Sequence, residues 1–536
     1  MHISSFSCLI TQRLNYTFNI EKLLHFFKGF NHRMHKINPH IFPLLPPDAT
    51  TGQVSGRKVN ECSMSSTQNA DCGIIGSVTQ GTLAQKFHVR PNTNLIEDYD
   101  MTLVNDEQDQ EEFNGLPESS QEIILKSSKK LVLMKLEDQL QSNSDILDFP
   151  KITFLGTGSS VPSKYRNVSS ILVENLPGKY IILDCGEGTV LQLHRMFGRE
   201  KAMDVLTGLT AVYISHLHAD HHLGLIQIIK ERENAFCKKQ ETVKPLYLIA
   251  PSRISVFLCL YHAKFENILT DLVQIRNEHL LPFFPPNPNG IQPLRNEPGS
   301  PFLPNNPYSN KNVCASDNPV ATQKLYPNIL NSLLEAIGLS SLHTCRALHC
   351  PGAFSVKFNF EYQDGKQFKL VYTGDTRPTE QLVEFSLGAD LLIHEATLEH
   401  YMLEDCKMKK HSTFTEAVET VKKANAKFAI LTHFSQRYSK FPIFDEFENE
   451  GNVGCAWDFM SVSPKTFKYI NCIYQAVNER FPEELQEMLT RKEGFCCKGQ
   501  STEKRINEQL GIDQGTVDNC NGSNKSKKQK LFSDPS

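Results

Sequence analysis

The chain has 536 residues, with 56 Lys and Arg against 60 Asp and Glu, and a formal net charge of −4 at pH 7. A chain of this length can form two or three domains, and its balanced charge excludes a protein that binds nucleic acid through overall positive charge. The 15 cysteines are scattered without a regular framework, which favours reduced thiols in an intracellular protein over a disulfide scaffold. No apolar run is long enough to span a membrane, so we predict no membrane association.

The first 36 residues combine five Lys and Arg with one acid and carry apolar residues at helical spacing. This composition is typical of a mitochondrial presequence, although an ordinary buried helix has the same pattern. Residues 37–149 are mostly polar and include an acidic run at 105–112, so we expect a largely disordered linker. Within it, only residues 122–140 indicate a helix or a pair of strands.

The pattern changes at Lys151, where apolar runs of strand length alternate with turns and with helices predicted at 190–197, 224–235 and 253–261. We predict a catalytic domain over residues 150–480, interrupted at about 281–312 by an insertion rich in Pro and Asn. Residues 481–536 are expected to be helical and then disordered. Their basic run at 525–530 would suit contact with RNA or a nuclear import receptor, but a solvated tail is the simpler interpretation.

The segment 215–222 follows the apolar run 210–214 and holds four histidines and one aspartate within seven consecutive residues. Imidazole nitrogens and carboxylate oxygens are ligands that zinc prefers. Residues two apart in an extended chain face the same way, so His216 and His218 can hold one ion, while Asp220 and His221 face a second ion beside it. A histidine-rich surface loop is the alternative.

Later strand-like runs also end in a histidine or an acid, and these residues can complete two sites. We expect His349 to join the first ion, His433 the second, and Asp375 to bridge both. Between two such ions a water molecule loses its proton near neutral pH, which predicts hydrolysis. Asp184 is expected to orient a ligand by accepting an imidazole N–H.

Two polar clusters remain beyond the predicted ligands, at 394–395 and at 411–413. A leaving oxygen on a sugar needs a proton, and His411 oriented by Glu395 could supply it as a general acid. His394 is expected to support the ligands from behind them. Structural polar residues would give the same sequence pattern.

The segment His216-Leu217-His218-Ala219-Asp220-His221, together with Asp184, His349, Asp375 and His433, resembles the metallo-β-lactamase superfamily. The resemblance implies an α/β protein, an αββα sandwich with a dinuclear metal site at one edge. It leaves lactams, thioesters, lactones and phosphodiesters open as substrates.

Three further motifs resemble tRNase Z, a family of tRNA 3′-processing endonucleases, in its long form. They are a PxKxRN loop at 162–167, a HEAT motif at 394–397 and an HST motif at 411–413, and the match covers about residues 150–440. The resemblance implies two Zn²⁺, with Mn²⁺ or Mg²⁺ as possible replacements, and precursor tRNA as the partner. Cleavage would follow the discriminator nucleotide and leave a 3′-hydroxyl on the tRNA.

The same resemblance implies roles for individual residues. Asp220 would also accept a proton from the attacking water, and Glu395 with His411 would donate one. Lys164, Arg166 and Asn167 would contact the acceptor end of the RNA, since Lys and Arg neutralise phosphate and tRNA is recognised mainly by shape and backbone.

Long-form members also carry a large amino-terminal half with an arm that grips tRNA, and nothing in residues 1–150 resembles it. The alternatives to a tRNA endonuclease are a small-molecule metallohydrolase, such as a thioesterase or phosphodiesterase, and a shortened, arm-less RNA-binding isoform. A partner chain, including a second copy in a homodimer, is a further possibility. The first and last segments predict a location in the mitochondrion, the nucleus or both.

Overall fold

The computed structural model describes most of the chain from residue 113 to residue 481 and shorter parts before it. The described residues are 31–39, 41–45, 85–87, 95–97, 113–141, 148–163, 166–281, 329–362, 364–436, 451–472, 474–481, 486 and 490. The chain divides into one unit over Met1–Leu485 and another over Gln486–Ser536. All elements named below belong to the first unit. Except for Leu281, the predicted insertion lies outside the described residues, as does the basic run at 525–530.

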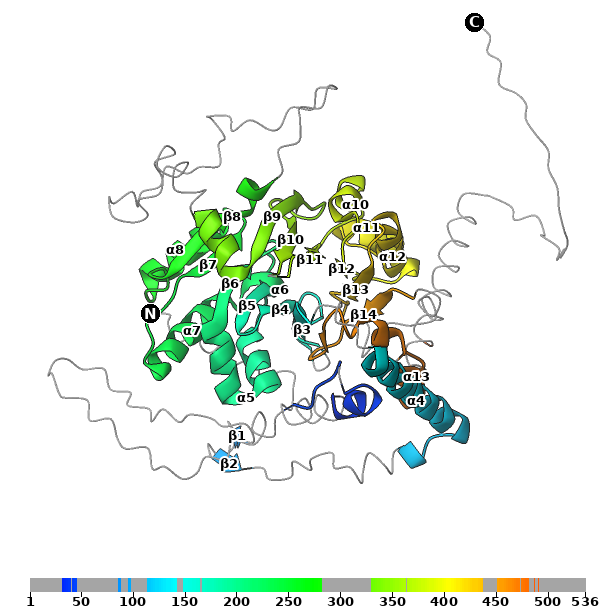
Figure 1. Cartoon of the computed structure of the whole chain (residues 1–536). Helices are drawn as coiled ribbons and strands as arrows, with labels where there is room; N and C mark the ends of the chain where they lie inside the picture. Colours follow the sequence, from blue (N-terminus) through cyan, green and yellow to red (C-terminus); the bar gives the residue numbers. More distant parts are fainter. Residues whose placement is uncertain are drawn as a thin grey trace, which may run out of the picture. The chain divides into compact units, whose positions relative to one another are not determined.

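Two β-sheets form the centre of the first unit (Figure 1), in the strand orders β15-β3-β4-β5-β6-β7-β8 and β14-β13-β12-β11-β10-β9. The first contains β3 (Lys151–Gly156), β4 (Ser170–Leu176), β5 (Lys179–Cys185), β6 (Leu209–Tyr213), β7 (Leu246–Ala250), β8 (Leu272–Arg276) and β15 (Ser461–Val462). The second contains β9 (Leu339–Arg346), β10 (Phe354–Glu361), β11 (Gln367–Tyr372), β12 (Leu391–Glu395), β13 (Phe428–Thr432) and β14 (Val453–Cys455). A separate pair is formed by β1 (Gln85–Phe87) and β2 (Leu95–Glu97).

Each large sheet is antiparallel in one part and parallel in the other. Strands β5 to β8 run parallel, as do β11 to β14. Parallel neighbours need long crossovers, and these contain α5 (Thr189–Gly208), α6 (Ala219–His222), α7 (Leu225–Lys239), α8 (Ile254–Lys264), α10 (Glu380–Ser386), η3 (His400–Met402), α11 (Leu403–Lys409) and α12 (Phe414–Lys423). The carboxyl ends of parallel strands therefore share one edge of each sheet, where the predicted ligands follow the strands.

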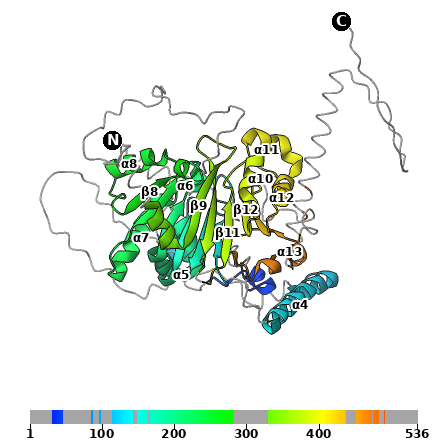
Figure 2. The same ribbon diagram turned by 45° about the horizontal axis from the view of Figure 1, so that its top comes forward.

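The sheets pack against each other through buried aromatic side chains. The ring of Tyr213 on β6 meets those of Phe358 and Tyr372 in the second sheet at centroid distances of 6.4 and 6.5 Å, and its hydroxyl donates to Phe354 O at 2.7 Å. Figure 2 shows α5 and α7 outside one sheet and α10 and α12 outside the other. This arrangement confirms the predicted αββα sandwich.

Segments that precede the sandwich in the sequence pack against segments that follow it. The helix at 31–37 leads to Phe42, whose ring lies 5.8 Å from that of Trp457, and Ser461 N donates to Ile41 O at 2.7 Å. Helix α4 (Glu118–Gln141) packs against α13 (Tyr474–Arg480) and η4 (Phe467–Cys472). The predicted limits of the catalytic domain, 150 and 480, stay predictions.

Within the described residues, none of the helices is both long and apolar enough to cross a membrane.

Candidate metal centre

The histidine-rich segment leaves β6 in an extended conformation and then enters the short helix α6. His218 is extended, with φ −73° and ψ 149°, as predicted, but residues 219–222 form a helical turn instead of an open one. This turn buries Asp220 and His221. His222 points elsewhere: its Nδ1 lies 2.8 Å from His218 O and its ring packs edge-on against Phe257.

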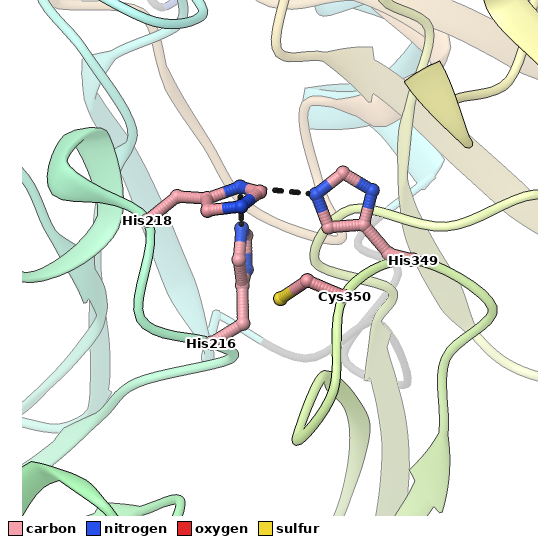
Figure 3. Close-up of side chains that lie close together, drawn as sticks. All are labelled: His216, His218, His349 and Cys350. Atoms are coloured by element: carbon pink, nitrogen blue, oxygen red, sulfur yellow. Dashed lines mark hydrogen bonds between the residues drawn. The ribbon is translucent and has the colours of Figure 1, made fainter. Parts of the chain in front are cut away.

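Three histidines form the first group of donor atoms (Figure 3). His218 Nδ1 lies 3.0 Å from His216 Nε2 and 3.1 Å from His349 Nε2, and His349 lies three residues after the end of β9. Nitrogen ligands of one tetrahedral zinc lie about 3.3 Å apart, given bonds of about 2.0–2.1 Å. The spacing of these rings therefore suits one ion.

Asp220, His221 and His433 form the second group. Asp220 Oδ2 lies 3.5 Å from His221 Nε2 and 3.4 Å from His433 Nε2. His433 follows β13 with φ +63°, a left-handed conformation that is uncommon for a residue with a side chain. Such strain is concentrated at functional sites because the surrounding structure must hold it in place.

Asp375 lies between the two groups. Its Oδ2 is 3.6 Å from His216 Nε2 and 3.3 Å from His221 Nε2, and its Oδ1 is 3.4 Å from His433 Nε2. The preceding Gly374 has φ +57°, and a Cβ there would lie 2.6 Å from Ser215 Cβ, so only glycine allows this approach. The structure thus brings all seven predicted ligands together.

The donor groups fit divalent ions. His221 Nε2 and Asp375 Oδ1 are buried and make no hydrogen bond among the described residues, which is costly unless another partner satisfies them. Burial alone would raise the pKa of Asp375, but three surrounding histidines hold that pKa well below its ordinary value. Burial and neighbouring histidines lower the pKa of His216, which keeps its ring neutral and able to bind a metal.

Asp184 holds His221 in place from behind. Its Oδ2 lies 2.7 Å from His221 Nδ1 and accepts hydrogen bonds from Ser215 Oγ and Tyr372 Oη, both also at 2.7 Å. Its Oδ1 accepts from Ser215 N. The carboxylate therefore directs Nε2 of His221 towards Asp375 and Asp220.

Glu395 and His411 lie beside the ligands. Glu395 Oε1 is 3.0 Å from His411 Nδ1 and accepts from Thr376 N at 2.7 Å. Burial would lower the pKa of His411, but the Glu395 carboxylate outweighs burial and raises it to about 9. His411 is therefore protonated at neutral pH. His394 alternates with Glu395 along β12, and its Nδ1 lies 2.6 Å from Glu395 O; among the described residues it makes neither a hydrogen bond nor an ion pair with the predicted ligands.

The predicted RNA-contacting residues are placed differently. Lys164 lies outside the described residues. Arg166 is only 2% exposed: its Nη1 donates to Thr157 Oγ1 at 2.7 Å and its guanidinium lies 4.7 Å from the centroid of Phe434. Asn167 is also buried and donates to Glu187 O at 3.0 Å. Burial of both side chains favours a role in holding the loop rather than in contacting RNA.

The sequence did not predict the role of Asp458, whose carboxylate holds Thr157 and Asn167 in place. Asp458 Oδ1 accepts from Thr157 N and Oγ1, and its Oδ2 accepts from Asn167 N and Gln192 Nε2. The only signal for it is an acid within the otherwise apolar segment 453–460. Cys350, beside the first ligand group, was also missed.

Comparison with known proteins identifies the relatives of this chain. Residues 150–256 match the family model described as anti-Pycsar protein Apyc1. Ribonuclease Z, mitochondrial, of Drosophila melanogaster is 30% identical over 467 residues, which are 86% of this chain and 53% of that protein. Zinc phosphodiesterase ELAC protein 2 of Rattus norvegicus is 34% identical over 86% of this chain and 49% of its own length. The crystal structure of a long-form RNase Z from yeast has a TM-score of 0.51 and 31% identity, and the match covers 63% of this chain and 45% of that one.

The chain is a ribonuclease Z homologue. The resemblance to long-form tRNase Z inferred from the motifs is confirmed, and the αββα arrangement of the two sheets agrees with it. This ribonuclease Z homologue spans about half the length of the curated relatives it matches.

Proposed function

We propose that the chain is a metal-dependent endoribonuclease that removes the 3′ trailer from precursor tRNA after the discriminator nucleotide, leaving a 3′-hydroxyl. The observation that carries this proposal is the Glu395–His411 pair, because His411 Nδ1 lies only 3.9 Å from Asp375 Oδ2 at the centre of the ligand groups. A protonated imidazole at this place suits a poor leaving group such as a ribose oxygen. The names of the relatives, which include ribonuclease Z, support the same reaction.

The donor groups suit two Zn²⁺, and zinc is named in the rat relative. The first ion would be held by His216, His218 and His349, and the second by Asp220, His221 and His433, with Asp375 bridging both. Mn²⁺ or Mg²⁺ could take the same places. When bound, such ions supply an activated water and neutralise charge on the scissile phosphate.

The residues of the chain move the protons. Burial would raise the pKa of Asp220, but His221 and His433 hold it well below its ordinary range. Asp220 is therefore ionised before the attack and would accept the proton of the attacking water, becoming neutral, while Ser160 N, which donates to its Oδ2 at 2.6 Å, fixes its orientation. Because Nδ1 of His411 faces Glu395, its Nε2 is left to protonate the leaving oxygen.

The partner and the location belong to the same proposal. Precursor tRNA would be held at the loop 162–167, where Lys164 is the remaining candidate for a phosphate contact. A mitochondrial location is supported by the names of the Drosophila and Arabidopsis thaliana relatives, both described as mitochondrial. Location in the nucleus and a homodimer stay predictions.

A cleavage assay with two substrates tests the reaction. We expect the purified chain with zinc or manganese to cut an end-labelled precursor tRNA once, giving a tRNA 3′-hydroxyl and a trailer with a 5′-phosphate. An acceptor-stem minihelix with a trailer should be cut as well, since it needs no grip on the distant tRNA elbow. Asp220→Ala is the inactive control.

The alternatives make different predictions in this assay. Loss of cleavage of both RNAs, together with turnover of a small thioester or phosphodiester, would show a small-molecule hydrolase. Binding of tRNA that Asp220→Ala leaves unchanged, without any hydrolysis, would show the RNA-binding isoform.

A further inference from the structure

We propose that Lys409 and Lys410 bind phosphates of the RNA strand on the 5′ side of the scissile bond, next to the oxygen that leaves. The two lysines stand at the end of α11, directly before His411, and both are exposed. This inference rests on the proposed function and adds a contact for the RNA outside the loop 162–167.

The backbone of Lys410 is attached to the candidate metal centre. Its carbonyl oxygen lies 2.9 Å from Nδ1 of His349, a predicted ligand of the first ion. The ring of His349 in turn lies 4.7 Å from that of His411, measured between centroids. Lys410 is therefore held between a metal ligand and the proposed proton donor, and its side chain starts one residue away from that donor.

The conformation of Lys410 is unusual for a residue with a side chain. It is left-handed, with φ 58° and ψ 47°, where Lys410 N and His411 N donate back to Lys407 O and Cys406 O at the end of α11. Glycine is the most common residue at this position of a helix end. The helix dipole favours cations in the last turn, but it does not require a side chain where glycine fits best. Such strain is concentrated at functional sites.

The charges of the two lysines are available to a ligand. Within the described part of the chain, neither ammonium group forms an ion pair or a hydrogen bond. By contrast, Lys407 and Arg377 on neighbouring segments are paired with carboxylates. Burial raises the pKa of the Cys350 thiol in the turn after β9, and the Lys410 ammonium acts in the opposite direction. The charge of Lys410 is therefore within electrostatic reach of the first ligand group.

The proposed reaction decides which part of the RNA lies beside these lysines. Water attacks the phosphorus, the bond from phosphorus to O3′ of the discriminator nucleotide breaks, and the phosphate stays on the trailer. The departing O3′ takes its proton from His411, so the strand that ends in this oxygen lies on the side of His411. Its next phosphate is one nucleotide away. A lysine offers a point charge on a flexible stem, which suits a phosphate contact without reading a base.

A minihelix substrate with one neutral linkage tests the contact. A methylphosphonate on the 5′ side of the discriminator nucleotide should lower kcat/KM of the metal-loaded wild-type chain about two- to fivefold, the range of exposed charge pairs. The double variant Lys409→Gln/Lys410→Gln should lose at least as much on the unmodified RNA, as a higher KM with kcat unchanged. It should lose nothing further on the modified RNA. The slope of log(kcat/KM) against log[salt] should become shallower by about 0.7–0.9 for each lost contact.

Two further variants separate charge from structure. Lys409→Arg/Lys410→Arg keeps both charges and should keep kcat/KM and the salt slope. Lys423→Gln removes the lysine that ends α12, which leads to the amino end of β13, opposite the edge with the ligands. This variant also loses a cation at a helix end, and it should behave as the wild-type chain does.

Each failure has its own meaning. If the double Gln variant keeps the wild-type kcat/KM and salt slope, the contact is overturned, while the proposed function stands. A loss that adds fully to that of the neutral linkage would also overturn it. If the loss disappears instead with a methylphosphonate inside the trailer, the lysines face the trailer and the assigned side is wrong. A wild-type chain that does not cleave the unmodified RNA would overturn the proposed function, and this contact with it.

Discussion

The Oδ2 atom of Asp184 lies 2.7 Å from Nδ1 of His221, and both residues are completely buried. The contact fixes the proton of His221 on Nδ1 and leaves Nε2 as the donor atom for a metal. Since Asp184 also receives hydrogen bonds from Ser215 and Tyr372, its own position is fixed by both sheets.

Asp184→Asn should weaken metal binding without removing any ligand. An amide presents a hydrogen-bond donor or a weaker acceptor to His221, and loss of such a partner typically lowers metal affinity about 10–100-fold. Competition with a chromophoric chelator measures the affinity. Tyr372→Phe is the matched control, because it removes one hydrogen bond to the same oxygen and keeps the carboxylate; it should have a smaller effect. Equal affinities for Asp184→Asn and the wild-type chain would contradict this role.

His411→Ala should slow cleavage about 10²–10⁴-fold in single-turnover assays, because the leaving oxygen loses its proton donor. Metal content, measured by elemental analysis, should stay unchanged. The pKa of His411, raised to about 9, keeps the acid form present at neutral pH, so the rate should fall only as the pH rises through about 9.

Glu395→Gln independently tests whether His411 is the proton donor to the leaving oxygen. Removing the carboxylate removes the largest effect that raises the pKa of His411, so the alkaline limb of the pH–rate profile should shift to lower pH. A limb that stays in place in the Glu395→Gln profile would show that another group donates the proton.

The ligands could be predicted because each follows a buried strand. The residues after β6, β11 and β13 lie at the edge where parallel strands end, so apolar runs of strand length were enough to gather His216, Asp375 and His433. The turn α6 could not be read in the same way, since residues 219–222 have no periodicity of their own. The predicted helix at 190–197 ended where Gly198 interrupts α5 with φ +72°, yet helical structure continues to Gly208.

The residues that support the site were less predictable, because their partners are distant in the sequence. Arg166 meets Ala456 O at 3.2 Å, and Asp458 meets Thr157, each across about 300 residues. A basic residue in a phosphate-binding motif suggests contact with RNA, and only the packing shows that this guanidinium is buried. Nothing in a single sequence separates the two roles.

Thr413→Ala should affect both stability and cleavage. Thr413 caps α12 in a reciprocal box with Glu416, and Glu416 also pairs with Arg377, whose Nη1 donates to His411 O at 2.6 Å. Losing the cap should cost about 1 kcal/mol and lower the melting temperature by about 2–4 °C. Because the same contacts position His411, the cleavage rate should fall severalfold.

The matched control is Thr379→Ala, which removes the cap of α10, where Thr379 Oγ1 accepts from Leu382 N at 3.1 Å. It should lower the melting temperature to a similar extent and leave the single-turnover rate unchanged. If both variants slow cleavage equally, the effect of Thr413 is general destabilisation rather than positioning of His411.

Asp458→Asn should destabilise the loop at 157–167. In the wild-type chain both carboxylate oxygens accept hydrogen bonds, whereas an amide turns one of them into a donor that faces Thr157 or Asn167. One unsatisfied buried group costs about 1–3 kcal/mol, which urea unfolding at pH 7 would measure. Asp148→Asn is the matched control: its side chain is 65% exposed, and the change should stay within about 0.5 kcal/mol.

The difference in unfolding free energy between the wild-type chain and Asp458→Asn should also depend on pH, which gives a second measurement. Burial raises the pKa of Asp458 from 3.8 to about 6, so between these values the folded chain binds the proton more tightly than the unfolded chain. The contribution of this carboxyl to stability therefore decreases as the pH rises from 3.8 to about 6 and is constant above. Asp458→Asn lacks this titration, so the wild-type chain should exceed the variant in stability by more at pH 4 than at pH 7. A difference that does not change with pH, or that grows towards pH 7, would contradict a buried Asp458 with a raised pKa.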